Sequence, residues 1–351
     1  MSVLTNAPAF SSLDIQPIQF VVDVPSYRGE TIIEAAKQFS VLGDDIQIEG
    51  AAWPDELGNN MYRITGKGGT YILKIKAVPD VERLKLSEGI YRFLDKKSPD
   101  VLIPLCTNKG EMYPLAGDGR VIECLPYIDG HHFQDEPQCL IKLGEALKRL
   151  HQVLEQMPLS HDVAASSEIW EQRLDKGRAA LAEGIACSRN DDLNNWLDRN
   201  KDYLGRVQTG WLSLFDIPGE RQPVHGDLNR GNVFFEKTSE KVWLLDFEDA
   251  PFAMMSRLME LAFVIQRFCL HDEAEPAVVS GRMDQIFEGY GELLPGLEML
   301  PDLWRLWCYR STVRIFCRVF ENRLIFDSSE LDKFVHLEQQ AMRYASSVRN
   351  Y

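Results

Sequence analysis

Polar and apolar residues alternate along three stretches in the first quarter of the chain. These stretches are I-Q-I-E-G at 46–50, N-M-Y-R-I-T-G at 60–66 and G-G-T-Y-I-L-K-I-K at 68–76. Such alternation predicts half-buried β-strands, and the G-K-G-G sequence between the last two predicts a hairpin turn. Apolar runs at 101–105, 112–115 and 120–128 predict further strands, and helical periodicity predicts helices over 30–39 and 82–94. We therefore expect a small, mostly antiparallel sheet with one or two helices.

A helical period replaces the alternation at about residue 137. Five leucines recur at spacings of three and four residues, which is one face of an α-helix: Leu140, Leu143, Leu147, Leu150 and Leu154. The same period returns in 167–209, 256–268 and 302–322, with a strand–turn–strand pattern between the first two. The expected fold is therefore α+β, with an N-terminal arm (1–28), a small sheet-containing lobe (29–125) and a larger, mainly helical lobe (126–351).

The composition narrows the classes of function. The 351 residues carry a formal net charge of −15, so nucleic acids and anionic membrane surfaces are not expected as partners. The seven cysteines are odd in number and lack C-x-x-C spacing, so we interpret them as buried free thiols in a reducing compartment. The chain shows no signal-peptide pattern and no run near the ~20 apolar residues of a membrane span. The expected location is the cytoplasm, whereas the oligomeric state has no signature in the sequence.

Polar residues gather around two short apolar runs, in H-G-D-L-N-R-G-N (225–232) and L-L-D-F-E-D (244–249). The first follows the H-x-D-L-x-x-x-N pattern of the protein-kinase catalytic loop, with Gly in place of Arg, and the second has an Asp where kinases bind metal. Phosphoryl transfer needs a carboxylate that orients the acceptor hydroxyl and cations that face the phosphate charge. Carboxylate and amide oxygens suit Mg²⁺. The candidates for catalysis and metal binding are therefore Asp227, Asn232 and Asp246.

A lysine on the third predicted strand would supply further positive charge. The Y-I-L-K-I sequence resembles the V-A-I-K strand of kinases, whose lysine contacts the nucleotide phosphates, and this favours Lys74. Lys76 points to the same face of the strand and remains an alternative. Glu88, on the following helix, is the expected partner of this lysine, with Glu82 as the alternative.

Three other features add to this picture. The loop at 49–60 is expected to cover the nucleotide, with Asn59 and Asn60 offering amide donors to phosphates. An aromatic group on a later helix is interpreted as core packing rather than as an aromatic cage: Trp304, Trp307 and Tyr309. Arginines recur every four residues on the same helix and form either a solvated stripe or a contact to an anionic substrate: Arg310, Arg314 and Arg318.

The chain resembles the aminoglycoside phosphotransferase, choline kinase and homoserine kinase group of kinase-like enzymes over roughly residues 30–325. The resemblance is carried by V-H-G-D-L-N-R-G-N-V-F (224–234), L-L-D-F-E-D-A (244–250), L-G-E-A-L-K-R-L-H (143–151) and E-C-L-P-Y-I-D-G (123–130). It implies a bilobal, protein-kinase-like fold that uses ATP and Mg²⁺.

The resemblance also implies a role for each matching residue of the catalytic section. Asp227 would be the catalytic base, while Asn232 and Asp246 would bind Mg²⁺. His225 would brace the catalytic loop rather than react. Glu260 stands where this family often has an Asp that opens the next helix, and we expect it to support the catalytic loop.

In the nucleotide section, the resemblance implies that Lys74 contacts the α- and β-phosphates and pairs with Glu88. The backbone around Glu123 to Leu125 would hydrogen-bond to the adenine.

The expected activity is transfer of the γ-phosphate of ATP to a hydroxyl of a small metabolite, such as an amino alcohol, a sugar or a homoserine-like amino acid. One alternative is a protein Ser/Thr kinase of the bacterial stress-response type, although no activation loop ending in A-P-E is present. The other is a pseudokinase that serves as a binding scaffold, which the complete set of expected catalytic residues disfavours. The acceptor itself has no local signature in the sequence.

Overall fold

This computed structural model describes residues 29–48, 60–76, 81–158, 161–182, 191–212, 214–239, 241–270, 274–320 and 328–348. The predicted arm at 1–28, Asn59, Cys187 and nearly all of the predicted cover loop lie outside the described residues. The chain divides into two compact units. The sheet unit is formed by Val22–Ser167 and Pro218–Leu297, and the helical unit includes Glu168–Ile217 and Glu298–Tyr351. The expected lobe boundary at residue 125 falls inside the sheet unit and stays a prediction.

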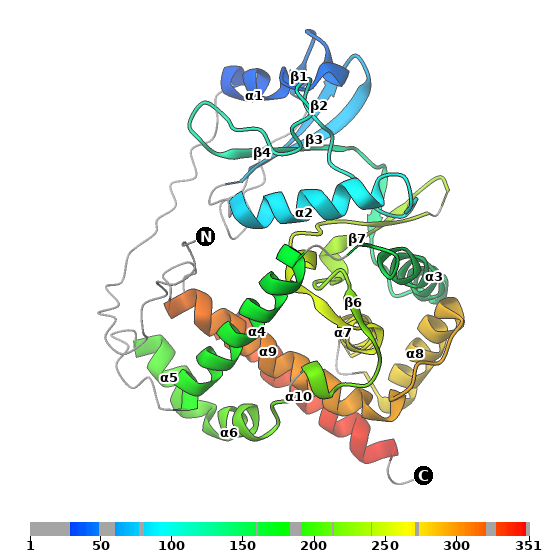
Figure 1. Cartoon of the computed structure of the whole chain (residues 1–351). Coiled ribbons are helices and arrows are strands. Elements are labelled where there is room, and N and C mark those ends of the chain that lie inside the picture. Colours follow the sequence, from blue (N-terminus) through cyan, green and yellow to red (C-terminus); the bar gives the residue numbers. More distant parts are fainter. Residues whose placement is uncertain are drawn as a thin grey trace. The chain divides into compact units, whose positions relative to one another are not determined.

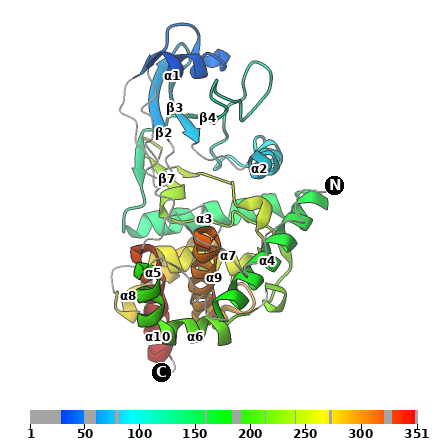
Figure 2. The same cartoon turned by 90° about the vertical axis from the view of Figure 1, so that its left-hand side faces the viewer.

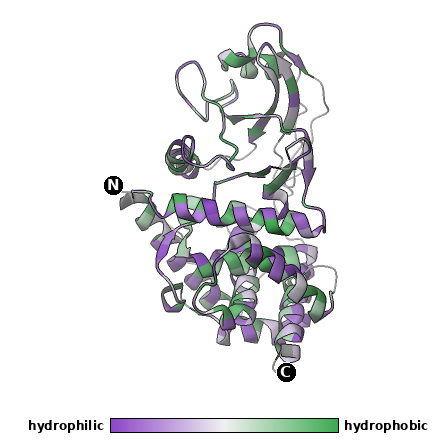
Figure 3. Cartoon of the chain, turned by 90° about the vertical axis from the view of Figure 1, so that its right-hand side faces the viewer, coloured by the Kyte–Doolittle hydropathy of each residue, from purple (hydrophilic) through white to green (hydrophobic). Residues whose placement is uncertain are grey.

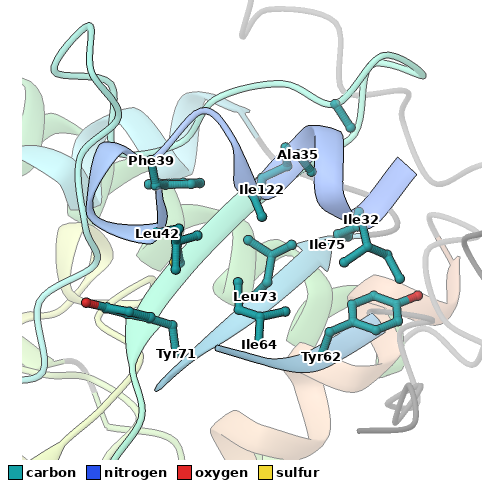
Figure 4. Close-up of a cluster of buried hydrophobic side chains, with 13 residues drawn as sticks. Ile32, Ala35, Phe39, Leu42, Tyr62, Ile64, Tyr71, Leu73, Ile75 and Ile122 are labelled. Atoms are coloured by element: carbon teal, nitrogen blue, oxygen red, sulfur yellow. The ribbon is translucent and has the colours of Figure 1, made fainter. Parts of the chain in front are cut away.

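Four antiparallel strands form the first sheet of the sheet unit, in the order β1-β2-β3-β4 (Figure 1). They are β1 (Gln47–Ile48), β2 (Asn60–Gly66), β3 (Gly69–Lys76) and β4 (Val121–Pro126). Helix α1 (Gly29–Ala36) packs on one face, because alternate side chains of β3 point to it, namely Tyr71, Leu73 and Ile75. Figure 4 shows Ile75 beside Ile32 of α1, and Tyr71 on the side of Leu42, within one buried cluster. The other face of β3 therefore carries Lys74 and Lys76.

Two predicted strands, at 101–105 and 112–115, were wrong. These segments contain only isolated bridges, Val101 to Leu244 and Leu115 to Val121. Each run contains a proline, at Pro104 and Pro114, and proline has no N–H for a strand ladder. The hairpin of β2 and β3 agrees with the prediction, with Gly66 opposite Gly69.

Two smaller sheets complete the β-structure of the sheet unit. One joins β5 (Gly130–His132), β7 (Val233–Glu236) and β8 (Val242–Leu244), and the other joins β6 (Arg221–Pro223) and β9 (Met254–Ser256). The predicted hairpin within 224–249 is the antiparallel pair β7 and β8. The catalytic-loop sequence lies between β6 and β7, so its polar residues follow one strand and precede another.

Helices of the sheet unit include α2 (Val81–Leu94), α3 (Pro137–Leu154), α7 (Arg257–Cys269) and α8 (Pro276–Tyr290). The five leucines predicted to share a face are all buried on α3. Helices α3 and α8 pack with their backbones in contact at Gly144 and Gly289, where any added Cβ would overlap main-chain atoms of the opposite helix. Short 3₁₀ turns at Ser40–Leu42, Arg230–Asn232 and Ala250–Phe252 connect elements of this unit.

The helical unit contains α5 (Asp191–Arg199), α6 (Lys201–Thr209), α9 (Leu300–Phe320), α10 (Ser328–Val348) and most of α4 (His161–Ala182). Helices α9 and α10 pack along each other, as Figures 1 and 2 both show. Trp304, Trp307 and Tyr309 are buried, which confirms their interpretation as core. Arg310 is also buried and pairs with Glu171, so it is not part of a solvated stripe.

Hydrophobic and hydrophilic residues lie side by side on the helices (Figure 3). Within the described ranges, no helix combines the length and the apolar character needed to cross a membrane. Five cysteines are buried free thiols, as expected: Cys124, Cys139, Cys269, Cys308 and Cys317. Among the described cysteines the exception is Cys106, which is exposed.

Candidate active site

His225 anchors the start of the loop that contains Asp227. Its ring is fully buried, and Nε2 lies 2.7 Å from the carbonyl oxygen of Leu245. Because that oxygen can only accept, Nε2 carries the proton and donates, which leaves Nδ1 to accept from the Asp227 N–H at 3.3 Å. The ring also packs against Phe247, with centroids 4.3 Å apart. These contacts fit the bracing role expected for His225.

Asn232 and Asp227 are joined directly. The Asn232 Nδ2 donates to the main-chain oxygen of Asp227 at 2.8 Å, across a short 3₁₀ turn that Asn229 caps by accepting from the Gly231 N–H. Because the NH₂ group of Asn232 donates in this contact, its Oδ1 remains as the atom that can accept a hydrogen bond or bind a cation. The main-chain oxygen of Asn232 accepts from the Leu245 N–H at 2.9 Å, which brings the residue beside the segment that carries Asp246.

A buried chain of hydrogen bonds supports the turn before Asp227. The Gly226 N–H donates to Glu260 Oε1 at 2.7 Å, and Glu260 Oε2 lies 2.8 Å from His151 Nε2. His151 Nδ1 lies 2.8 Å from the Tyr290 hydroxyl. The supporting position predicted for Glu260 is confirmed by this geometry.

The charge on Glu260 follows from its neighbours. Burial alone raises the pKa of Glu260, but the hydrogen bond from His151, electrostatic interactions with the His151 and His225 rings, and the hydrogen bond from the Gly226 N–H bring the pKa below its ordinary value. Glu260 is therefore ionised at neutral pH and only accepts, so the proton of the His151–Glu260 contact is on Nε2. Burial raises the pKa of Tyr290 to about 12, which keeps its hydroxyl protonated.

Asp246 follows β8 in a left-handed backbone conformation, with φ of 60°. It is the one described residue other than glycine with a positive φ. Burial raises its pKa, but the positive charges of Lys74 and, to a lesser degree, Lys76 more than offset this and lower the pKa below its ordinary value. Backbone strain of this kind is concentrated at functional sites. The hydrogen bonds of Asn232 to Asp227 and to Leu245, together with the effect of Lys74 on Asp246, show that Asp227, Asn232, Asp246 and Lys74 lie in one region.

Glu88 does not pair with Lys74 in this structure. Its Oε1 accepts from Arg92 Nε at 2.8 Å, and Arg92 also donates to the main-chain oxygen of Gly110. Glu88 and Arg92 are four residues apart on α2, a spacing that brings opposite charges together on one helix face. That spacing was a readable signal for this pair. The side chain of Glu82, the alternative, lies outside the part of the chain that can be described.

The buried face of α2 contacts the segment after Asp246 through other residues. The Tyr91 hydroxyl accepts from the Phe247 N–H at 3.0 Å, and the two rings meet edge to face. Arg83 forms an ion pair with Asp249 and donates from Nε to the main-chain oxygen of Glu248 at 2.9 Å. Sequence reasoning missed these contacts, because no local pattern connects residues more than 150 positions apart.

The backbone of Glu123 and Leu125 is directed toward β3. The Ile122 N–H donates to the Pro114 oxygen at 2.8 Å, and the Cys124 oxygen accepts from the Leu105 N–H at 2.8 Å, so residues 122 and 124 point outward. In an antiparallel ladder the intervening residues point the other way. They stand opposite Lys74 and Ile72 in the register of β3. Adenine recognition by these two backbones therefore conflicts with the ladder.

Asn60 is the first residue of β2 and stands opposite Ile75, so its backbone belongs to the sheet. Its side chain and all of Asn59 lie outside the described structure. The predicted contact of both amides with phosphates therefore stays a prediction.

Known proteins resemble this chain in sequence and in fold. A family model described as the phosphotransferase enzyme family matches residues 52–295. A homoserine kinase from Chelativorans sp. (strain BNC1) is 27% identical over 256 residues, which are 70% of this chain and 73% of that protein.

Two solved structures resemble the whole fold. An amicoumacin kinase in complex with AMP-PNP, Ca²⁺ and Ami has a TM-score of 0.61 and 17% identity, covering 90% of this chain and 93% of that one. A spectinomycin phosphotransferase in complex with ADP and spectinomycin has a TM-score of 0.60 and 15% identity, covering 91% and 98%. These likenesses confirm the protein-kinase-like α+β fold. Together with the family match over more than half of its length, they identify the enzyme class: the chain belongs to the phosphotransferase enzyme family.

Proposed function

We propose that this phosphotransferase transfers the γ-phosphate of ATP to a hydroxyl of a small metabolite in a Mg²⁺-dependent reaction, with Asp227 as the base. The observation that carries the proposal is the hydrogen bond from Asn232 Nδ2 to the Asp227 main chain, which orders the catalytic loop beside the Asp246 segment. The related homoserine kinase and the two similar structures with nucleotides support a small hydroxyl acceptor and a nucleotide donor.

The donor set fits a magnesium ion. Asn232 offers a neutral amide oxygen and Asp246 an ionised carboxylate, both of them hard oxygen ligands. A protein site of this kind is completed by phosphate oxygens. When bound there, Mg²⁺ would supply positive charge against the phosphates.

Each remaining residue has a physical task in this proposal. The Asp227 carboxylate accepts the hydrogen bond of the acceptor hydroxyl and orients it. Lys74, on the face of β3 opposite α1, adds positive charge toward the phosphates. Residues 29–125 act as the nucleotide-binding lobe, and residues 126–351 supply the catalytic and acceptor-binding parts.

Adenine recognition is assigned to the residues just after β4. The Tyr127 N–H donates to the Thr70 oxygen at 3.1 Å, so Tyr127 points toward β3, as Glu123 and Leu125 do. Alternation directs the main-chain groups of Pro126 and Ile128 to the opposite edge. We therefore expect the Pro126 oxygen and the Ile128 N–H to bind the adenine edge, with Leu125 contributing its side chain.

The proposal is tested by Mg²⁺-dependent ATP turnover over a panel of amino alcohols, homoserine, other amino acids, sugars, aminoglycosides and a generic protein. Wild type is compared with Asp227→Asn and with Asp284→Asn, a matched change at an exposed position on α8. Turnover that one small hydroxyl compound stimulates should fall by about 10²–10⁴-fold in Asp227→Asn and stay unchanged in Asp284→Asn. Transfer of radiolabelled phosphate from ATP to the generic protein alone would identify a protein kinase. If the chain neither turns over ATP nor binds the nucleotide, the proposed activity is wrong and the chain is a binding scaffold.

A further inference from the structure

Three charged side chains that no assigned role includes meet inside the sheet unit. Lys76 Nζ lies 3.3 Å from Glu123 Oε2 and also forms an ion pair with Glu248. The side chains of Lys76 and Glu123 are each 6% exposed, and that of Glu248 is 24% exposed. We call these residues the Lys76 cluster. It joins β3, β4 and the segment just after Asp246.

The geometry of the two strands makes this contact selective. Glu123 stands directly opposite Lys74 in the β3–β4 register, yet its carboxylate pairs with Lys76, two residues further along β3. Lys74 is only partly buried and acts on Asp246 through its charge. The two lysines share a face of β3 and both act on Asp246 through their charges, but Lys76 is the more deeply buried of the two and forms the ion pairs with Glu123 and Glu248.

Burial of Lys76 needs a reason beyond stability. Burial lowers the pKa of Lys76, and the nearby Glu123 carboxylate counteracts this. Removing charges from water is costly, and buried ion pairs often contribute no net stability compared with apolar side chains. Lys76 pairs with two acids, Glu123 and Glu248. Because Glu248 lies two residues after Asp246, its ion pair with Lys76 restricts the position of Asp246.

A second contact restrains the same segment from α2. Arg83 binds both the Asp249 carboxylate and the main-chain oxygen of Glu248. The segment is thus held by one cation from β3 and one from α2. Glu88, the residue expected to connect α2 with β3, is instead engaged by Arg92.

We propose that Lys76 is a positioning residue: together with Glu123 it holds Glu248, and thereby sets the place of Asp246. The inference rests on the proposed function for what Asp246 then does. The Lys76 cluster joins β3 and β4 to the segment after Asp246, whereas Glu88 of α2 pairs with Arg92.

The first experiment measures hydrogen–deuterium exchange in the ligand-free protein. Three amides of the Asp246 segment are hydrogen-bonded: those of Leu245, Phe247 and Ala250. We expect faster exchange of peptides covering 245–250 in Lys76→Met and Glu248→Gln, with unchanged exchange in the α3–α8 pair. Lys85→Met, an exposed lysine of α2, is the matched control and should exchange like wild type.

The second experiment measures kinetics and thermal unfolding of the same variants. We expect kcat/KM to fall by about 100-fold in Lys76→Met, as for a misplaced catalytic group. In Glu248→Gln, Lys76 keeps its ion pair with Glu123, so no buried charge is left unpaired. This variant can therefore be tested even if Lys76→Met does not fold. The double variant should lose no more activity than the worse single variant, because the two residues act as one unit.

Several results would overturn the inference. Unchanged exchange at 245–250 in both variants would show that the Lys76 cluster does not hold the segment. A large rise in the dissociation constant for ADP with unchanged exchange would make Lys76 a phosphate-binding lysine instead. If Glu88→Gln lowered kcat/KM and raised exchange at 245–250 more than Glu123→Gln did, α2 rather than the Lys76 cluster would position Asp246. Because exchange is measured without ligand, it tests whether the Lys76 cluster holds the 245–250 segment even if the proposed reaction is wrong.

Discussion

The carboxylate of Glu260 accepts a hydrogen bond from the main-chain nitrogen of Gly226 at 2.7 Å, across 34 positions of sequence. Gly226 has a φ of 84°, a left-handed conformation that needs support. The same carboxylate is held by His151, whose other nitrogen contacts Tyr290. The position of the loop that contains Asp227 therefore depends on a buried anion and the two side chains behind it.

Glu260→Gln should lower the free energy of unfolding by roughly 1.5–3 kcal/mol, because hydrogen bonds to a buried charged group are lost or weakened. The pKa of Glu260 is lowered in the folded protein, so its charge stabilises the fold above its ordinary pKa of 4.5. This contribution disappears as the pH falls through the lower, folded pKa. Urea unfolding should show a larger deficit of the variant at about pH 7 than at about pH 3.5. An equal deficit at both would contradict the assigned ionisation.

Tyr290→Phe should destabilise the protein by roughly 1–3 kcal/mol, because the buried His151 Nδ1 loses its partner while the ring contact remains. Thermal unfolding measures the change. A variant as stable as wild type would mean that another group satisfies His151, and the hydrogen-bonded chain would then end at that residue.

Gly226→Ala should cost at least roughly 1–2 kcal/mol, because an alanine is strained at positive φ. Its Cβ would also lie 2.6 Å from the Cβ of Ala253. The matched control is Gly89→Ala within α2, where an added Cβ meets nothing within 4 Å. That change should stabilise the protein by roughly 0.5–1 kcal/mol. Equal effects of the two substitutions would contradict the left-handed turn at Gly226.

Asp246→Asn should abolish Mg²⁺-dependent turnover while leaving the fold intact. Asparagine tolerates the left-handed conformation and has nearly the same shape, so the change removes only the charge. Because the pKa of Asp246 is lowered, wild-type metal binding should persist down to its ordinary value of 3.8 before protonation competes. Calorimetric titration with Mg²⁺ and ADP measures this. Unaltered Mg²⁺ dependence in the variant would remove Asp246 from the metal site.

Glu338→Ala in the helical unit should cost roughly 1.5–3 kcal/mol, because it removes the buried acceptor of hydrogen bonds from the partly exposed Arg206 and from Tyr309. The Glu338 carboxylate is fully buried, accepts two hydrogen bonds from Arg206 at 2.8 Å, and accepts one from Tyr309 at 2.6 Å. Glu330→Ala on the same helix breaks only an exposed pair with Lys333 and should change stability by less than about 1 kcal/mol. Chemical denaturation compares them, and similar losses would contradict the burial of Glu338.

Local patterns were sufficient for the elements whose partners are close in sequence. The β2–β3 hairpin follows from alternation and a glycine turn, and α3 follows from the spacing of its leucines. The catalytic-loop motif likewise located Asp227 and Asn232, which the structure joins. These signals are short-range, and the tertiary structure left them unchanged.

Contacts between distant segments could not be predicted in the same way. Alternation indicated that Lys74 and Lys76 share a face, but not that Glu123 and Glu248 would bury one of them. The Glu88–Arg92 pair had a readable helical spacing, yet the kinase resemblance took precedence over it. Resemblance transfers a motif well and transfers its side-chain partners poorly, because a partner from another segment can replace the expected one.

The strained backbone of Asp246 implies a trade-off between durability and activity. An aspartate in the left-handed conformation lowers the stability of the fold by about 1–3 kcal/mol. Because this strain is present in the ligand-free protein, the carboxylate is already in position before a ligand binds. Asp246→Gly would relieve that strain. Relief of the strain would also remove the charge that Lys74 and Lys76 stabilise and on which the proposed chemistry of the enzyme depends.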